Sequence, residues 1–143
     1  MLENNSLLRI CDFLKNKSRN KLIITEKQLD YITFFDIGLN YAKELSLFAL
    51  KNKNSYSIDF DILSKLVSEN TQSNELFGRF LAIKNTGILF EDALKINFQQ
   101  FITSNSQNYA LILLWEYGIE GGFLKFGTNK NIIDLKNISH III

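Results

Sequence analysis

Hydrophobic positions recur along this chain in two patterns, one with the spacing of a helix and one with short continuous runs. Apolar residues three or four positions apart predict helices, and runs rich in β-branched and aromatic residues predict strands. We expect helices over residues 7–14 (with Asn5 or Ser6 as N-cap), 39–51, from 59 to about 66, and within 93–104 after a turn. We expect strands over residues 22–25, 31–35, 80–83, 109–115, 123–126 and 138–143.

The segments between these elements are polar and short. Lys51–Ser57 is predicted to be a loop and Glu69–Asn74 a polar hinge between elements. Gly118, Gly121 and Gly122 break the chain between two apolar runs, which favours a tight hairpin.

The most hydrophobic run, Tyr109–Trp115 (YALILLW), predicts a central strand that is buried on both faces, as in parallel sheets. Strands alternate with helices along the rest of the chain. This alternation predicts an α/β fold with three layers, in which a mostly parallel sheet is flanked by helices. With 143 residues and no linker of low complexity, residues 1–143 are expected to form a single α/β domain.

Composition and charge narrow the classes of function. Hydrophobic residues make up 46% of the chain, which is enough apolar surface to offset the entropy lost on folding, so disorder is excluded for most of its length. The formal net charge is +1, whereas proteins that bind polyanions by neutralising phosphates usually carry a clear basic surplus. The cluster Lys15, Lys17, Arg19 and Lys21 nevertheless leaves one alternative open, a nucleic-acid-binding accessory protein.

The first residues, the hydrophobic runs and the cysteine content bear on the cellular location. The opening MLENNSLLRICDF has an early acid and no long apolar core, so we do not expect a signal peptide. No run approaches the roughly 20 apolar residues that span a bilayer. Cys11, the only cysteine, can form no internal disulfide. We expect a cytoplasmic protein with no membrane contact.

Residues with catalytic potential are few. His140 is the only histidine and has no evident nucleophile beside it, and the acid pairs Asp59/Asp61 and Glu91/Asp92 stand where helix starts are expected. The run after the first strand, 25–28, contains no glycine that could open a phosphate-binding turn. We therefore expect no catalytic, cofactor-binding or metal site. A small hydrolase or nuclease whose acids converge only in the fold remains a further hypothesis.

Two places favour contact with a partner. Trp115 and Tyr117 directly follow the central strand, where the ligand crevice of an open parallel sheet lies, although packing against a flanking helix is the commoner fate of such residues. The short apolar segment containing Ile138, Ile141 and Ile143 predicts a strand that either completes the chain's own sheet or pairs with another chain.

Four further stretches carry a family resemblance. Lys84–Phe90 reads KNTGILF, residues 91–102 read EDALKINFQQFI, residues 104–115 read SNSQNYALILLW, and residues 35–45 contain FDIGLN followed by KEL. Over residues 21–126 the chain resembles the BrxF family, the small P-loop-type proteins of type 3 BREX phage-exclusion systems. That family has the corresponding motifs "DNIE-ILF" after a Walker-B-like strand, "D-x-x-L-x-x-D-P-x-x-L-L", "SRNR" before a hydrophobic strand that closes in Trp-Pro-Gly, and "NIGLELS".

The departures from this family concern its catalytic groups. The metal-handling acids of the "DNIE" motif align with Lys84 and Gly87, and a lysine would repel Mg²⁺. The arginines of "SRNR" align with uncharged residues. The chain between Thr25 and Phe34 is too short for a phosphate loop and a helix.

The resemblance thus implies a degenerate P-loop-like protein that has lost its phosphate, metal and charge-stabilising elements together. We expect a non-catalytic accessory subunit without cofactors, acting through contacts with other protein subunits of a bacterial anti-phage defence complex. The nucleic-acid-binding alternative then becomes an accessory protein of a defence or restriction system, and assembly into a homo-oligomer is a further alternative.

Overall fold

The fold is built around β5 (Ala110–Leu114), whose five residues are all buried. It pairs in parallel with β4 (Gly78–Lys84) on one edge and with β1 (Leu22–Thr25) on the other. The prediction of a central strand over YALILLW is therefore confirmed. The structure is a computed structural model that describes residues 2–51, 59–127 and 130–143, with side chains for residues 5–48, 62–127 and 130–143.

The main sheet has the strand order β2-β4-β5-β1-β9, and all of these neighbours are parallel. Its outer strands are short, β2 (Phe35–Asp36) at one edge and β9 (His140–Ile142) at the other. The antiparallel strand β3 (Gln72–Asn74) pairs with the beginning of β4. The chain is thus an α/β protein with a mostly parallel central sheet, as predicted.

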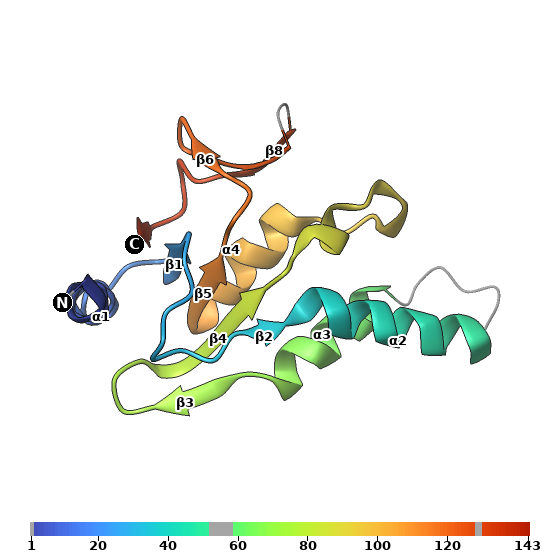
Figure 1. Ribbon diagram of the computed structural model, residues 1–143, viewed down its shortest axis with the longest axis horizontal. Helices are drawn as coiled ribbons and strands as arrows, with labels where there is room; N and C mark the ends of the chain where they lie inside the picture. The colour runs from blue at the N-terminus through green and yellow to red at the C-terminus, as the bar shows by residue number, and fades with distance from the viewer. Residues whose placement is uncertain (1, 52–58, 128–129) are drawn as a thin grey trace.

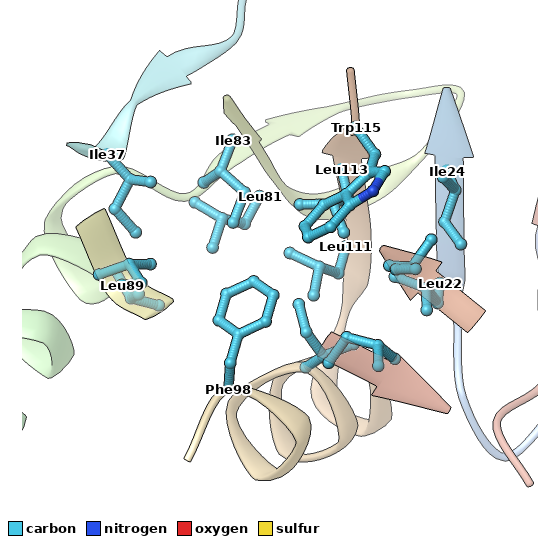
Figure 2. Close-up of a cluster of buried hydrophobic side chains, with 14 of the residues drawn as sticks. Leu22, Ile24, Ile37, Leu81, Ile83, Leu89, Phe98, Leu111, Leu113 and Trp115 are labelled. Atoms are coloured by element: carbon cyan, nitrogen blue, oxygen red, sulfur yellow. The ribbon is translucent and has the colours of Figure 1, made fainter. Parts of the chain in front are cut away.

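One face of this sheet carries the larger hydrophobic core. It is covered by the helices α2 (Ile37–Lys51), α3 (Asp59–Glu69) and α4 (Phe98–Asn108), by the short 3₁₀ helices η1 (Gly87–Phe90) and η2 (Asp92–Leu94), and by a second sheet. Figure 2 shows Phe98 pointing from α4 toward the sheet residues Leu81 and Leu111.

The second sheet is antiparallel and has the order β6-β7-β8, with β6 (Ile119–Glu120), β7 (Phe123–Phe126) and β8 (Lys130–Asp134). Gly121 and Gly122 both have positive φ and form the turn between β6 and β7, so the predicted hairpin is present. In Figure 1 this sheet lies above the main sheet, while α1 and β9 lie at one end and α2 and α3 at the other.

The opposite face has a thinner cover. The helix α1 (Leu2–Lys15) contributes Ile10 and Phe13, and the loop between β1 and β2 contributes Leu29, Ile32 and Phe34. The predicted strand over residues 31–35 is therefore wrong for residues 31–34. Ile32 and Phe34 are buried against the face of the sheet, but residues 31–34 do not have strand conformation.

Smaller differences concern the bounds of elements. The first helix begins before Asn5 and Ser6, so neither residue is its N-cap. The segment 93–104 is split, because Asn97 caps α4 through a bond from the Gln100 amide to its side chain. The polar hinge contains β3, and β8 was not predicted. Of the predicted loop Lys51–Ser57, residues 52–57 lie outside the described residues, and Lys51 belongs to α2.

No helix within the described part of the chain is long and apolar enough to cross a membrane.

Replacing Leu111 by alanine tests how far stability depends on β5. Leu111 has no exposed surface and lies between Leu22 and Leu81 in the sheet, so Leu111→Ala leaves a cavity. We expect the free energy of unfolding to fall by about 2–5 kcal/mol in urea denaturation. The control Leu76→Ala makes the same change at a side chain that is 60% exposed, and its effect should stay within about 0.5 kcal/mol. Equal losses in the two variants would contradict the central role of β5.

Candidate functional site

The carboxyl ends of the strands form the region of the sheet that is best suited to hold a ligand. From β1 the chain passes to β2 on one side, whereas from β5 it passes to β9 on the other side. Adjacent strands that lead off in opposite directions leave a crevice between their ends, and open α/β sheets bind ligands there. This switch point lies between β5 and β1.

A small cleft of about 290 Å³ lies at this edge. It is lined by residues that follow or end four parallel strands: Gln28, Asp36, Lys84, Asn85, Leu114, Glu116 and Tyr117. Two carboxylates and one ammonium group therefore share a polar cleft, although they come from segments far apart in the sequence.

Asp36 already serves the start of α2. Its Oδ1 atom accepts hydrogen bonds from the backbone amide of Leu39 at 2.8 Å and from the Asn85 side chain at 2.9 Å. A carboxylate at this position satisfies an amide that would otherwise lack a partner and complements the positive end of the helix. The N-terminus of α2 therefore offers little attraction to a second anion such as a phosphate.

The end of β4 is fixed against α2 by a very close backbone approach. A Cβ atom added at Gly38 would lie 2.0 Å from the carbonyl oxygen of Asn85. Asn85 itself has a left-handed backbone, with φ of 59°, which turns the chain sharply after Lys84. Only glycine at position 38 lets the start of α2 contact this turn, so Asp36 and Lys84 are held side by side in register.

The segment after β1 lacks the features of a phosphate-binding loop. Thr25 Oγ1 donates to the carbonyl of Lys27 and accepts from its amide, which closes a turn that has no glycine. No helix follows within residues 26–34. Backbone amides at a helix N-terminus, which bind phosphate in nucleotide sites, are therefore not presented at the end of this strand.

Lys84 and Gly87, where the resemblance places acids, lie in different surroundings. Lys84 is half-buried at the end of β4 and lines the cleft. A Cβ atom at Gly87 would lie 3.5 Å from Phe126 Cε2 and from the Tyr117 hydroxyl. A side chain at position 87 would thus point toward aromatic rings.

Trp115 and Tyr117 belong to a cluster of aromatic rings beneath the second sheet. Trp115 contacts Phe90 with ring centroids 5.4 Å apart and Tyr117 at 5.0 Å, and its Nε1 atom donates to the carbonyl of Gly118. Trp115 has no exposed surface, so its side chain offers a partner no contact area in this conformation. Tyr117 is half-buried and lines the cleft, and its contact with a partner stays a prediction.

The predicted contact strand at residues 138–143 completes the chain's own sheet, because β9 pairs with β1. Ile138 is buried, whereas Ile141 and Ile143 are half-buried. His140 is half-buried too, and its Nδ1 atom is 2.7 Å from the carbonyl of Ile138.

The outer edge of β9 is capped by α1. The amide of Ile143 donates to Ile24 of β1, so the carbonyl of the same peptide group, that of Ile142, points away from the sheet. Arg9 Nη2 donates to this carbonyl at 2.8 Å. An exposed edge invites pairing with other chains, and an arginine bound there restricts it.

The remaining candidates lie apart from the cleft. Cys11 is half-buried in the core under α1, and Asp92 pairs with Lys130 at 3.6 Å on the surface. The side chains of Asp59 and Asp61 lie outside the described residues. Among the described side chains, no group of three or more His, Cys, Asp or Glu residues could hold a metal ion.

The basic cluster lies at the end of α1 and in the loop that leads to β1. Lys15, Lys17 and Arg19 are exposed, and Lys21 is half-buried. None of them forms an ion pair with a described residue. They line neither the cleft nor the hollow between α3 and α4, and charged residues of this kind usually form a solvated loop.

The sequence analysis did not predict that Asp36 and Glu116 line the same cleft. Asp36 ends β2 and Glu116 lies two residues after β5, and this position near a strand end is the signal that would have suggested it. Comparison with protein-family models, curated proteins and solved structures gives no match to this chain.

Gly38→Ala tests the close approach that shapes the cleft. The added methyl group would collide with a backbone oxygen, so α2 or the turn after β4 must shift. We expect a loss of about 1–3 kcal/mol in the free energy of unfolding, measured in urea. The control Gly87→Ala makes only ordinary contacts at 3.5 Å and beyond and should cost less than about 0.5 kcal/mol. If Gly38→Ala were as stable as the control, the approach would not restrain the cleft.

Proposed function

We propose that this chain is a non-catalytic, degenerate P-loop-like accessory subunit that acts through protein–protein contacts in a bacterial anti-phage defence system. The family resemblance over residues 21–126 motivates the proposal, and two features of the structure support it.

The first support is the order of the parallel strands. In the sequence β5 follows β4, yet in the sheet β5 lies between β4 and β1. The central strands are therefore not in sequence order, and the carboxyl end of β1 lies beside that of β5, in the region where open α/β sheets bind ligands. In the family that the chain resembles, the phosphate loop follows the first strand, which corresponds to the end of β1 here.

The second support, which carries the proposal, is the set of groups at the strand ends where a nucleotide would bind in the family that the chain resembles. The end of β1 leads into a turn without glycine, the nearby N-terminus of α2 is capped by Asp36, and β4 ends in Lys84. A nucleotide triphosphate with Mg²⁺ would need amide donors for its phosphates and an acid for its metal. The cleft provides a carboxylate where the phosphates need donors and a lysine where the metal needs an acid.

Isothermal titration of the full chain with ATP and Mg²⁺ tests the loss of nucleotide binding. We expect no binding in the micromolar range and no release of phosphate, because the turn after β1 forms no phosphate-binding loop and Asp36 already caps the N-terminus of α2. Micromolar binding, or turnover by the chain alone, would overturn the non-catalytic assignment.

Phage plating on the native host tests the role in defence. Deletion of the gene should raise the plating efficiency of a phage that the host restricts, and the wild-type gene should reverse this. The variant Lys84→Ala should reverse it equally well, since the cleft takes no part in catalysis. Unchanged restriction in the deletion strain would contradict the defence role. If the wild-type gene restored restriction and the Lys84→Ala gene did not, the claim that the cleft takes no part in catalysis would be contradicted.

A hydrolase or nuclease is a second candidate function, because Asp36 and Glu116 line the same cleft as Lys84. Two carboxylates near one lysine can in principle hold a divalent ion and stabilise negative charge. The capping role of Asp36 accounts for one of them without catalysis, which is why we rank this candidate second.

Hydrolysis of bis-p-nitrophenyl phosphate with Mg²⁺ or Mn²⁺ separates the two candidates. We expect no release of nitrophenolate above a protein-free blank. Turnover that Glu116→Gln abolishes, while Glu120→Gln leaves it intact, would establish the hydrolase. Glu120 is a matched control because it is an exposed acid on β6 that does not line the cleft.

A further inference from the structure

A hollow larger than the cleft lies away from it, between α3 and α4. It has a volume of about 900 Å³. Its apolar lining includes Leu63 and Val67 of α3, Phe101 of α4 and Ile96 before α4. We refer to this hollow, with Arg79 and Lys95 at its border, as the α3–α4 groove.

The groove follows one side of α4 over its full length. Asn97, Gln100, Ser104 and Asn108 line it at intervals of three or four residues, which is the spacing of a single helix face. A helix of 11 residues is about 16 Å long, so the groove extends over three turns. An occupant of matching shape is elongated, as another helix would be.

The described charges of the groove have one sign. Arg79 and Lys95 are the only charged side chains among its described lining residues, and the side chains of Asp59 and Asp61 at the start of α3 lie outside the described part of the chain. Arg79 and Lys95 are exposed, and neither forms an ion pair with a described residue. The groove thus combines an apolar floor with two cations that lack an acidic partner in the described chain.

Arg79 is held in place by an aromatic ring. Its guanidinium carbon lies 4.9 Å from the centroid of the buried Tyr109 ring, a distance at which a cation and a ring attract each other. Burial raises the pKa of the Tyr109 phenol, an effect that Arg79 partly opposes. The phenol therefore stays protonated at neutral pH and donates to the Asn105 side chain, which keeps the ring fixed beneath Arg79.

We propose that the α3–α4 groove binds an acidic amphipathic helix of a protein partner. The apolar face of this helix packs on Val67 and Phe101, and its Glu or Asp side chains pair with Arg79 and Lys95. Binding of an amphipathic helix in a groove is a common mode of peptide recognition. The inference rests on the proposed function, which requires contact with other proteins, and names the surface and the kind of partner.

A nucleic acid fits the same groove less well. A single strand carries about one phosphate every 3.4 Å, so a 16 Å groove would meet four or five negative charges with only two cations. Of the aromatic residues that line the groove, Phe101 is half-buried and Tyr109 is buried, whereas single strands are usually held by stacking on exposed aromatic rings. Charge and floor both favour a helix with few acids and an apolar face.

The experiment selects peptides from a phage-displayed library of 16-residue helices on the immobilised full chain. Apolar residues at i, i+3, i+4 and i+7 are fixed as Leu, Ile or Phe, and the flanking positions are randomised. We expect enrichment of Glu and Asp at the flanks, and micromolar binding of the selected peptides by fluorescence polarisation. The affinity should fall on addition of salt.

Variants of the chain assign the binding to the groove. Arg79→Glu combined with Lys95→Glu should weaken the selected peptides at least about tenfold, because attraction becomes repulsion. Lys15→Glu combined with Lys17→Glu makes the same change of charge outside the groove and should leave affinity within about twofold. Ser64→Trp fills the groove from an exposed position on α3 and should also abolish binding. Circular dichroism and urea denaturation verify that each variant is folded.

Several results would overturn the proposal: no enrichment of acids, no peptide that binds, or selected peptides that bind the Arg79/Lys95 and Ser64 variants as well as wild type. A labelled single-stranded DNA that binds tightly and depends on Arg79 and Lys95 would assign the groove to nucleic acid instead. Tight ATP binding would overturn the proposed function without affecting the peptide result, so the two failures can be told apart.

Discussion

The burial of β5 on both faces and both edges is the constraint from which the rest of the structure follows. Leu111 and Leu113 face the core under α4, while Ile112 and Leu114 face the core under α1 and the loop after β1. Because both edges of β5 are paired, β1 and β4 must lie on either side of it. The cleft lies at the carboxyl ends of these strands, whereas the α3–α4 groove runs along α4 and reaches Arg79 and Tyr109 near the amino ends of β4 and β5.

The sequence allowed β5 to be predicted because its signal is local, an unbroken apolar run of strand length. Residues 31–34 were predicted wrongly since the same kind of apolar run also arises when a loop covers a sheet face. β8 was missed because of its five residues only Ile133 is buried, and its strand conformation depends on pairing with β7. Propensity cannot detect an element that is specified by its neighbour.

The same distinction applies to the candidate site. The turn without glycine after β1 could be predicted from the sequence, because a phosphate loop depends on consecutive residues. The cleft could not, since Asp36 and Glu116 are separated by 80 positions and meet only through the strand order. Asp36 also illustrates how one carboxylate satisfies a structural need: its bond to Leu39 caps α2, and the contact between Gly38 and Asn85 keeps that cap beside Lys84.

The surfaces of the molecule differ in how many of their polar and charged groups already have partners within the chain. At β9 the outward carbonyl of Ile142 is already bound by Arg9, so a partner strand that needed it would have to displace the arginine. At the cleft Asp36 already has two donors. In the groove, by contrast, Arg79 and Lys95 lack an acidic partner within the described chain. An incoming acid would therefore complement the charge of the groove, whereas a ligand at β9 or the cleft would compete with hydrogen bonds that the chain already makes.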